Sequence, residues 1–288
     1  MNLFKTSTVE QLAQSIPSGT RLCVAKDESG VSMAVTRELA RRARDGILRD
    51  LHLITVPVSG LQADILIGAG AVSALETSAV SLGEYGPAPC FTRAVKAGAI
   101  RLIDGTCPAI YAGLQAGEKG IPFIPLRGIV ESDLMRHRHD WKLIANPFAA
   151  TDDPIVLIQA ITPDIALFHA PCADRFGNVF VGRQREVATM AHAARATFVT
   201  VERMVDEDLA HHPQMAGSTI PAVYISAIAV APRGAAPLQL GGEYGLDEAA
   251  LARYAKHAAS EVGFEEWLQD WLSTASGLKG APLAALAA

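Results

Sequence analysis

The sequence predicts an α/β fold with a mostly parallel sheet flanked by helices. Short apolar segments of strand length alternate along most of the chain with segments of about ten residues that have helical spacing. A strand, a helix and a second strand in succession favour parallel pairing of the two strands. We expect one domain over 1–288, with an Ala-rich tail at 280–288 that is frayed.

The N-terminal half opens with a short helix that ends at Ile16. Ser7 and Glu10 have the spacing of a capping box at its start. A strand at 21–25 and the loop 26–30 precede an amphipathic helix that ends at Asp45 and Gly46. The other elements expected in this half are strands at 51–57, 74–80, 99–103 and 121–126, and helices at 60–68, 89–98 and 108–116.

A polar segment at 128–142 precedes the C-terminal half. His137 and His139 within it could bind a metal or form part of a basic surface. Paired histidines without an acidic or cysteine partner are a weak metal signal, so we favour a solvated loop and predict no metal site. The elements expected beyond are strands at 141–145, 155–161, 165–168, 196–201 and 223–230, and helices at 186–194 and 246–272.

The stretch 163–186 combines a buried strand with an ordered polar turn. The apolar run 165–168 lies between two prolines and predicts a short strand. Asp174, Gly177 and Asn178 then predict a compact turn, because Asp and Asn bond nearby backbone groups and Gly accepts a positive φ. A functional loop on a rigid scaffold and a purely structural turn both fit this pattern.

Charge and composition exclude several classes of protein. The formal net charge is −5, which argues against non-specific nucleic-acid binding. The N-terminus lacks the pattern of a signal peptide, and the longest apolar runs are too short to cross a bilayer. The four cysteines include no C-x-x-C pair, so neither a zinc framework nor disulfides are expected. We therefore expect a cytoplasmic protein without membrane or nucleic-acid partners.

Four motifs occur in an order that resembles a known family. They are GEYGPAP at 83–89, GLQAG at 113–117 leading into GIPFIPLRG at 120–128, ADRFGN at 173–178 and APRGAAP at 231–237. Together they resemble the α (A-type) subunits of the family I CoA-transferases, in particular the glutaconate CoA-transferase type. The resemblance covers nearly the whole chain.

The resemblance implies a CoA-transferase-like fold and a partner β subunit. It implies that coenzyme A is a substrate, with no permanently bound cofactor, and that CoA moves between an acyl-CoA and a free carboxylic acid. In the family, the thioester is attacked by a glutamate of the β subunit, within a Glu-Ser-Gly or Glu-Asn-Gly motif that follows a strand. A chain of the α type would then supply the other wall of the cleft.

Two carboxylates are candidate catalytic groups. Glu28 stands in a Glu-Ser-Gly sequence, but this follows the first strand, whereas the β-subunit motif follows the second. Here the second strand runs into Val58, Ser59 and Gly60, without a carboxylate. Glu28 could equally interact with the dipole of the next helix. Glu84 lies in a Gly- and Pro-rich loop and could be functional or could cap the helix at 89–98.

The candidate residues for binding substrate or CoA are Ser29, Gly30, Arg127, Gly128 and Asn178. Arg127 ends an apolar strand and could hold a carboxylate or a CoA phosphate through a two-pronged contact, although a structural ion pair is an equal alternative. Asn178, with Asp174, is more suited to shaping its loop than to contacting a substrate.

The loop 26–30 departs from the family because it lacks the paired glycines of α subunits. A CoA-thioester hydrolase or C–C hydrolase on the same scaffold is therefore an alternative. Such hydrolases use a glutamate just before the helix that contains Gly113, and Cys107 stands at that position. A non-catalytic acyl-CoA-binding partner is the third hypothesis.

Overall fold

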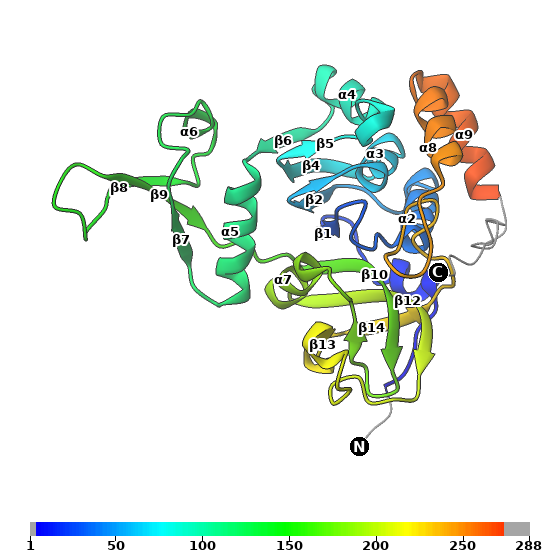
Figure 1. The fold of residues 1–288 in the computed structure, drawn as a ribbon. Coiled ribbons are helices and arrows are strands. Elements are labelled where there is room, and N and C mark those ends of the chain that lie inside the picture. The colour runs from blue at the N-terminus through cyan, green and yellow to red at the C-terminus, as the bar shows by residue number, and fades with distance from the viewer. Residues whose placement is uncertain (1–3, 274–288) are drawn as a thin grey trace.

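The computed structural model describes residues 4–273 and shows a mostly parallel sheet with helices on its faces (Figure 1). This arrangement confirms the predicted fold class. The tail 280–288 lies outside the described residues. The parallel strands, from one side of the sheet to the other, are β14 (Ala227–Val230), β12 (Ala196–Val205), β10 (Ile165–Asp174), β1 (Arg21–Ala25), β2 (Leu51–Val56), β4 (Val72–Thr77) and β6 (Arg101–Asp104).

The helices form two groups that pack on the sheet through one continuous apolar core. The first group comprises α5 (Cys107–Glu118) and α7 (Arg185–Ala193), which contact each other and β2. The second group packs together around α2 and α3, and in Figure 1 α8 and α9 form its outer layer. Its members are α1 (Val9–Gln14), α2 (Met33–Arg44), α3 (Leu61–Gly68), α4 (Pro89–Lys96), α8 (Glu248–Ala258) and α9 (Glu261–Ser273).

Residues 123–159, here called the arm, project from the body beyond α5 (Figure 1). The arm holds the short helix α6 (Leu134–His137) and a separate antiparallel sheet of β7 (Phe123–Leu126), β9 (Pro154–Gln159) and β8 (Lys142–Ala145). The sequence pattern places 121–126 in the parallel series, and this is wrong, because β7 pairs antiparallel with β9 in the arm. Strand β9 is already turned back on β8, since residues 146–153 are too few for the crossover that a parallel β8–β9 pair would need.

Strand β10 is longer than the predicted 165–168 and continues through Pro171 to Asp174. The backbone N–H of His169 donates to Gly30 O, on the side of β10 that faces β1. With a period of two, the missing N–H of Pro171 faces the same side. Pairing with β1 extends only as far as Leu167, and pairing with β11 (Val179–Phe180) begins at Cys172. Pro171 is tolerated because it falls in this gap.

The polar turn after β10 forms as predicted. Asp174 Oδ1 accepts hydrogen bonds from the backbone N–H groups of Phe176 and Asn178, both at 2.9 Å, and Gly177 has a φ of 93°. The first helix is capped one residue later than expected, by Thr8 and Gln11. The expected strand at 223–230 is a 3-10 turn, Ala222–Tyr224, followed by β14.

Between residues 4 and 273, no helix combines the length and apolar character needed to span a bilayer. The same residues contain no group of three or more His, Cys, Asp or Glu side chains arranged to hold a metal ion. All four cysteines are free, and Cys107 is the exposed one.

Candidate functional site

The strand order places a topological switch point between β1 and β10. From β1 the chain builds outward through β2, β4 and β6, whereas from β10 it builds in the opposite direction through β12 and β14. In open α/β sheets, ligands bind outside the carboxyl ends of the strands at such a point. A pocket of about 490 Å³ lies there, and its lining includes Ser29, His169, Pro171, Phe180, Arg183 and Leu240.

The loop after β1 contributes Ser29 to this pocket. Ser29 is buried, and its hydroxyl bonds to the carboxylate of Glu186 at the start of α7. Lys26 Nζ lies 3.4 Å from the same carboxylate. Burial raises the pKa of Glu186, but the Ser29 hydrogen bond and the charge of Lys26 outweigh it and leave the pKa below its usual value. Glu186 is therefore ionised at neutral pH, and Ser29 is the donor.

Gly30 joins the loop after β1 to β10. Its carbonyl accepts the His169 N–H at 2.6 Å, and its φ is 79°. A Cβ atom at this position would lie 2.1 Å from the His169 carbonyl oxygen. Glycine is therefore required both by the backbone conformation and by the close approach of the two chain segments.

Buried polar groups lie behind His169. Its Nε2 lies 2.6 Å from Glu202 Oε1, and its Nδ1 lies 2.8 Å from Thr200 Oγ1. The Tyr244 hydroxyl also donates to Glu202, at 2.8 Å, and the Arg233 N–H donates at 2.7 Å. Burial raises the pKa of Glu202, but these hydrogen bonds, led by that from His169, lower it by more. The ring of His169 is held from both nitrogens and forms a rigid wall of the pocket.

Arg183 is the only Lys, Arg, Asp or Glu side chain among the described lining residues of the pocket. The side chain is exposed, and its guanidinium makes no hydrogen bond or ion pair with residues 4–273. The remaining lining is largely apolar side chains and glycine backbone. Such a pocket suits an apolar ligand segment that carries one negative charge.

The predicted site residues fall into two groups. Ser29 lines the switch-point pocket, and Gly30 follows it in the loop and bonds to His169, another lining residue. Glu28 is exposed, and its backbone carbonyl accepts from Gln184 Nε2 at 2.9 Å. Glu84 is exposed on a 3-10 turn, Gly83–Tyr85. Within the described chain, the carboxylates of Glu28 and Glu84 form no hydrogen bond or ion pair.

The other predicted binding residues do not line the pocket. Arg127 directly follows β7 in the arm and pairs with Asp153 at 2.6 Å, with its side chain largely exposed. Gly128 follows it with a φ of 89°. Asn178 donates to Asp174 Oδ2 at 2.7 Å and accepts from the Ala222 N–H at 2.9 Å, so both ends of its amide hold the turn.

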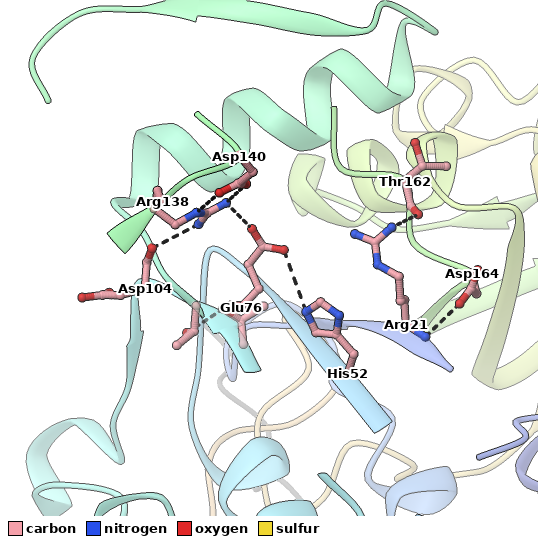
Figure 2. A network of polar contacts seen from close by, with 10 residues as sticks. Arg21, His52, Glu76, Asp104, Arg138, Asp140, Thr162 and Asp164 are labelled. Atoms are coloured by element: carbon pink, nitrogen blue, oxygen red, sulfur yellow. Dashed lines mark hydrogen bonds and ion pairs between the residues drawn. The ribbon is translucent and has the colours of Figure 1, made fainter. Parts of the chain in front are cut away.

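Figure 2 shows a second polar network, near the carboxyl ends of β4 and β6. Arg138, from the segment after α6, donates to Glu76 Oε1 at 2.8 Å, to the Asp104 carbonyl at 3.0 Å and to both carboxylate oxygens of Asp140. Burial raises the pKa of Glu76, and Arg138 offsets part of this rise. His52 Nε2 lies 4.0 Å from the other oxygen of Glu76. The network attaches the arm to the main sheet.

Sequence reasoning missed Glu186, Glu202 and Arg138. Glu202 directly follows the expected strand 196–201, so the rule that functional side chains follow strand ends could have identified it. The sequence pattern identifies Glu186 only as the start of the expected helix 186–194. Arg136, His137 and His139 are exposed, as a solvated loop would be, but the interpretation is wrong for Arg138, which is buried.

The sequence matches the profile of a family described as coenzyme A transferase over residues 5–231. The chain belongs to the coenzyme A transferase family. It is 29% identical over 249 residues to the A-type subunit of 3-oxoadipate CoA-transferase of Pseudomonas knackmussii, covering 84% of each chain. It is 26% identical over 265 residues to the cholesterol ring-cleaving hydrolase IpdA subunit of Rhodococcus jostii, covering 87% of this chain and 89% of that one.

Two solved structures of this fold are similar. Glutaconate coenzyme A-transferase of Acidaminococcus fermentans superimposes with a TM-score of 0.83 and 25% identity, covering 93% of this chain and 89% of that one. A single-residue variant of the decarboxylase AibA/AibB superimposes with a TM-score of 0.80 and 29% identity, covering 95% and 100%. The chain spans 53% of an uncharacterized Archaeoglobus fulgidus protein, to which it is 28% identical over 246 residues.

Proposed function

We propose that this chain is the α-type subunit of a CoA-transferase and that a B-type partner subunit brings the attacking glutamate. The observation that carries the proposal lies after β2. Residues 57–60 contain no carboxylate, and Asp27 accepts the N–H groups of Gly60 and Leu61 at 3.1 and 3.0 Å, at the start of α3. Burial raises the pKa of Asp27 to about 6. Asp27 is thus engaged in capping α3, which supports a nucleophile supplied by the partner.

The proposed reaction needs a carboxylate nucleophile but no net proton transfer. A carboxylate oxygen of the partner attacks the thioester carbon. The CoA thiolate departs, and the acyl group and the glutamate then form a mixed anhydride. The thiolate then attacks the glutamyl carbonyl, which releases the donor acid and forms a glutamyl-CoA thioester. The acceptor carboxylate repeats these steps in reverse. Each step exchanges one acyl bond for another, so a difficult transfer becomes several easier ones.

In this proposal Ser29 and Gly30 form part of the wall that faces the partner. The proton of Ser29 is directed to Glu186, so its oxygen can accept but not donate a hydrogen bond towards a ligand. Stabilisation of a tetrahedral oxyanion therefore falls to backbone N–H groups or to the partner. The proposal gives no chemical role to the other predicted site residues. The side chains of Glu28, Glu84 and Arg127 are exposed, and Gly128 and Asn178 shape local turns.

The switch-point pocket would take the acyl end of the substrate. Its lining is largely apolar, and Arg183 offers one cation without a partner among the described residues. We propose that Arg183 pairs with a negatively charged end group on the acyl chain. A planar guanidinium suits this contact because it can bind both carboxylate oxygens.

The proposal is tested by purifying this chain alone and together with the B-type subunit encoded in the same genome. Each sample is mixed with an acyl-CoA and an acceptor acid, and the new acyl-CoA is detected by mass spectrometry. We expect transfer only from the complex, with a borohydride-reducible glutamyl thioester on the partner. Full transfer by the chain alone would refute the proposal.

A hydrolase subunit is the second candidate. The observation in its favour is the loop after β1, which presents Lys26 and Ser29 where the family has paired glycines. Cys107, where such hydrolases have a glutamate, is exposed at the start of α5, 3.0 Å from Ser78 Oγ. This candidate predicts release of free CoA by the complex without an acceptor acid. If release depends on an acceptor acid, it fails.

A further inference from the structure

The arm exposes large apolar side chains that the rest of the described chain does not cover. Phe148 is 96% exposed and Leu143 is 52% exposed, and both lie on or beside β8. Phe123 and Ile144 are also exposed. Soluble monomers rarely present such a concentration of apolar groups on one projecting element, and it usually marks an interaction surface.

The arm is not able to bury these side chains itself. All four residues of β8 are exposed, so neither face of this strand is covered. The strand pairs with β9 alone, which leaves its other edge open within the described residues. The core beneath the arm is small, comprising Ala109, Ile129, Trp141, Val156 and Ile158. An uncovered apolar edge strand in a lone subunit would favour aggregation.

The arm is nevertheless held in a defined position. Arg138 connects the segment after α6 to Glu76 and to the Asp104 carbonyl, near the carboxyl ends of β4 and β6 (Figure 2). The segment of the arm that contains Arg138 therefore lies at the carboxyl ends of β4 and β6, and the switch-point pocket lies at the carboxyl ends of β1 and β10 in the same sheet. A surface fixed in advance loses little freedom on binding, which is a property of docking sites.

We propose that the arm is a docking surface for the B-type partner subunit, with Leu143 and Phe148 as its principal contacts. The inference rests on the proposed function, in which the partner closes over the carboxyl edge of the sheet. A protein that covers the carboxyl ends of these strands would also meet the segment of the arm that contains Arg138. A second copy of this chain could also cover apolar groups, but it would not bring the attacking carboxylate to this edge.

The test compares Leu143→Ser/Phe148→Ser with a matched double variant, Val223→Ser/Val262→Ser. The control side chains are 84% and 69% exposed but lie outside the arm, on the 3-10 turn Ala222–Tyr224 and on α9. Binding to the B-type subunit of the same genome is measured by biolayer interferometry. We expect the arm variant to raise the Kd at least about tenfold and the control to change it less than about twofold. Hydrogen exchange of 142–148 in the unaltered chain should slow when the partner binds.

The outcomes separate this inference from the proposed function. If the unaltered complex transfers CoA but the arm variant binds the partner normally and 142–148 remain unprotected, the docking inference is wrong while the function stands. If the chain alone is a dimer by light scattering and the arm variant is a monomer with normal partner affinity, the arm binds a second copy and the inference is also wrong. If the unaltered chain binds no B-type subunit, both proposals fail.

Discussion

Arg138 Nη2 lies 2.8 Å from Glu76 Oε1, and both side chains are almost fully buried. This ion pair joins two parts of the molecule with different architectures, the antiparallel arm and the parallel sheet. Arg138 also lies over the ring of Trp141, 4.3 Å from its centroid, so the guanidinium has both polar and aromatic contacts. Arg138 therefore helps to hold the arm in place, together with the packing of β7 and β9 on α5.

Replacing Arg138 should therefore destabilise the protein. In Arg138→Leu the Glu76 carboxylate remains buried without its partner, and we expect a loss of about 3–5 kcal/mol in the free energy of unfolding. Arg138→Leu/Glu76→Leu should recover part of this loss, because no uncompensated charge remains. Arg136→Leu is the control, since its pair with Asp133 is exposed and contributes at most about 1 kcal/mol. Urea unfolding measures all three, and equal losses at positions 136 and 138 would contradict the argument.

His52 should make stability depend on pH. Burial and the nearby charges of Arg21 and Arg101 lower the pKa of His52 to about 4, below the usual value of 6.5. The unfolded chain thus takes up a proton at this site before the folded chain does. The stability that depends on a neutral His52 is fully present above pH 6.5 and is lost as the pH falls towards 4.

The measurement is the free energy of unfolding at pH 7, 5.5 and 4 for the unaltered protein and His52→Gln. Carboxylates also titrate in this range, so only the difference between the two proteins is informative. We expect the unaltered protein to lose more stability, by up to about 1.4 kcal/mol for each pH unit between 6.5 and 4. Parallel curves would show that His52 is not held in its neutral form.

Gly30→Ala tests the junction of the loop after β1 with β10. The added Cβ would lie 2.1 Å from the His169 carbonyl oxygen, and the φ of 79° adds a conformational cost. Gly46→Ala is a matched control, because Gly46 has a φ of 71° and open space around its Cβ position. The control should lose about 1–2 kcal/mol, the cost of a left-handed conformation, and Gly30→Ala should lose more. Thermal unfolding compares them, and equal losses would mean that the contact is relieved without strain.

The sequence predicts the parallel sheet well because each βα unit is encoded locally. Strand β1 matches its expected bounds, and β2 ends one residue earlier than expected, before Pro57. The sequence does not predict the antiparallel sheet of the arm, because an apolar run such as 123–126 has the same pattern whether it pairs with parallel or antiparallel neighbours. The local pattern also predicts that the strand ends before Pro171. The strand continues because Pro171 falls where β10 has no partner on that side, and this gap in pairing depends on the assembled sheet.

The candidate site was predicted only in part. The motif letters point to Glu28, Ser29 and Gly30, and of these three Ser29 lines the switch-point pocket. Glu186 is 157 residues from Ser29 in the chain, so their hydrogen bond is not visible in any local pattern. His169 and Glu202 come together through the register of β10 and β12, where His169 is opposite Thr200. Such contacts depend on strand register rather than on residue type.

Ser29 and Glu186 should behave as one unit. In the complex with its partner, Ser29→Ala removes the acceptor at the pocket, and Glu186→Gln removes the charge that orients the Ser29 hydroxyl. We expect each to lower kcat/KM about tenfold or more, and the double variant to cost little beyond the larger single effect. Glu28→Gln is the control, with an exposed carboxylate and less than about a threefold change. Additive losses would show that the two side chains act independently.

Arg183 should determine which acyl groups the pocket prefers. Arg183→Gln removes the only cation of the described lining, so the complex should lose its preference for an acid-ended acyl chain. We compare glutaryl-CoA, pentanoyl-CoA and free CoA by their dissociation constants from the complex. A lost charge-assisted contact corresponds to about a tenfold or larger weakening for glutaryl-CoA, with little change for the other two. Arg185→Gln is the matched control, because Arg185 is exposed two residues away and does not line the pocket. Equal weakening of all three ligands by Arg183→Gln would mean that the guanidinium contacts a phosphate of CoA, and the pocket would then hold the CoA end of the substrate rather than its acyl end.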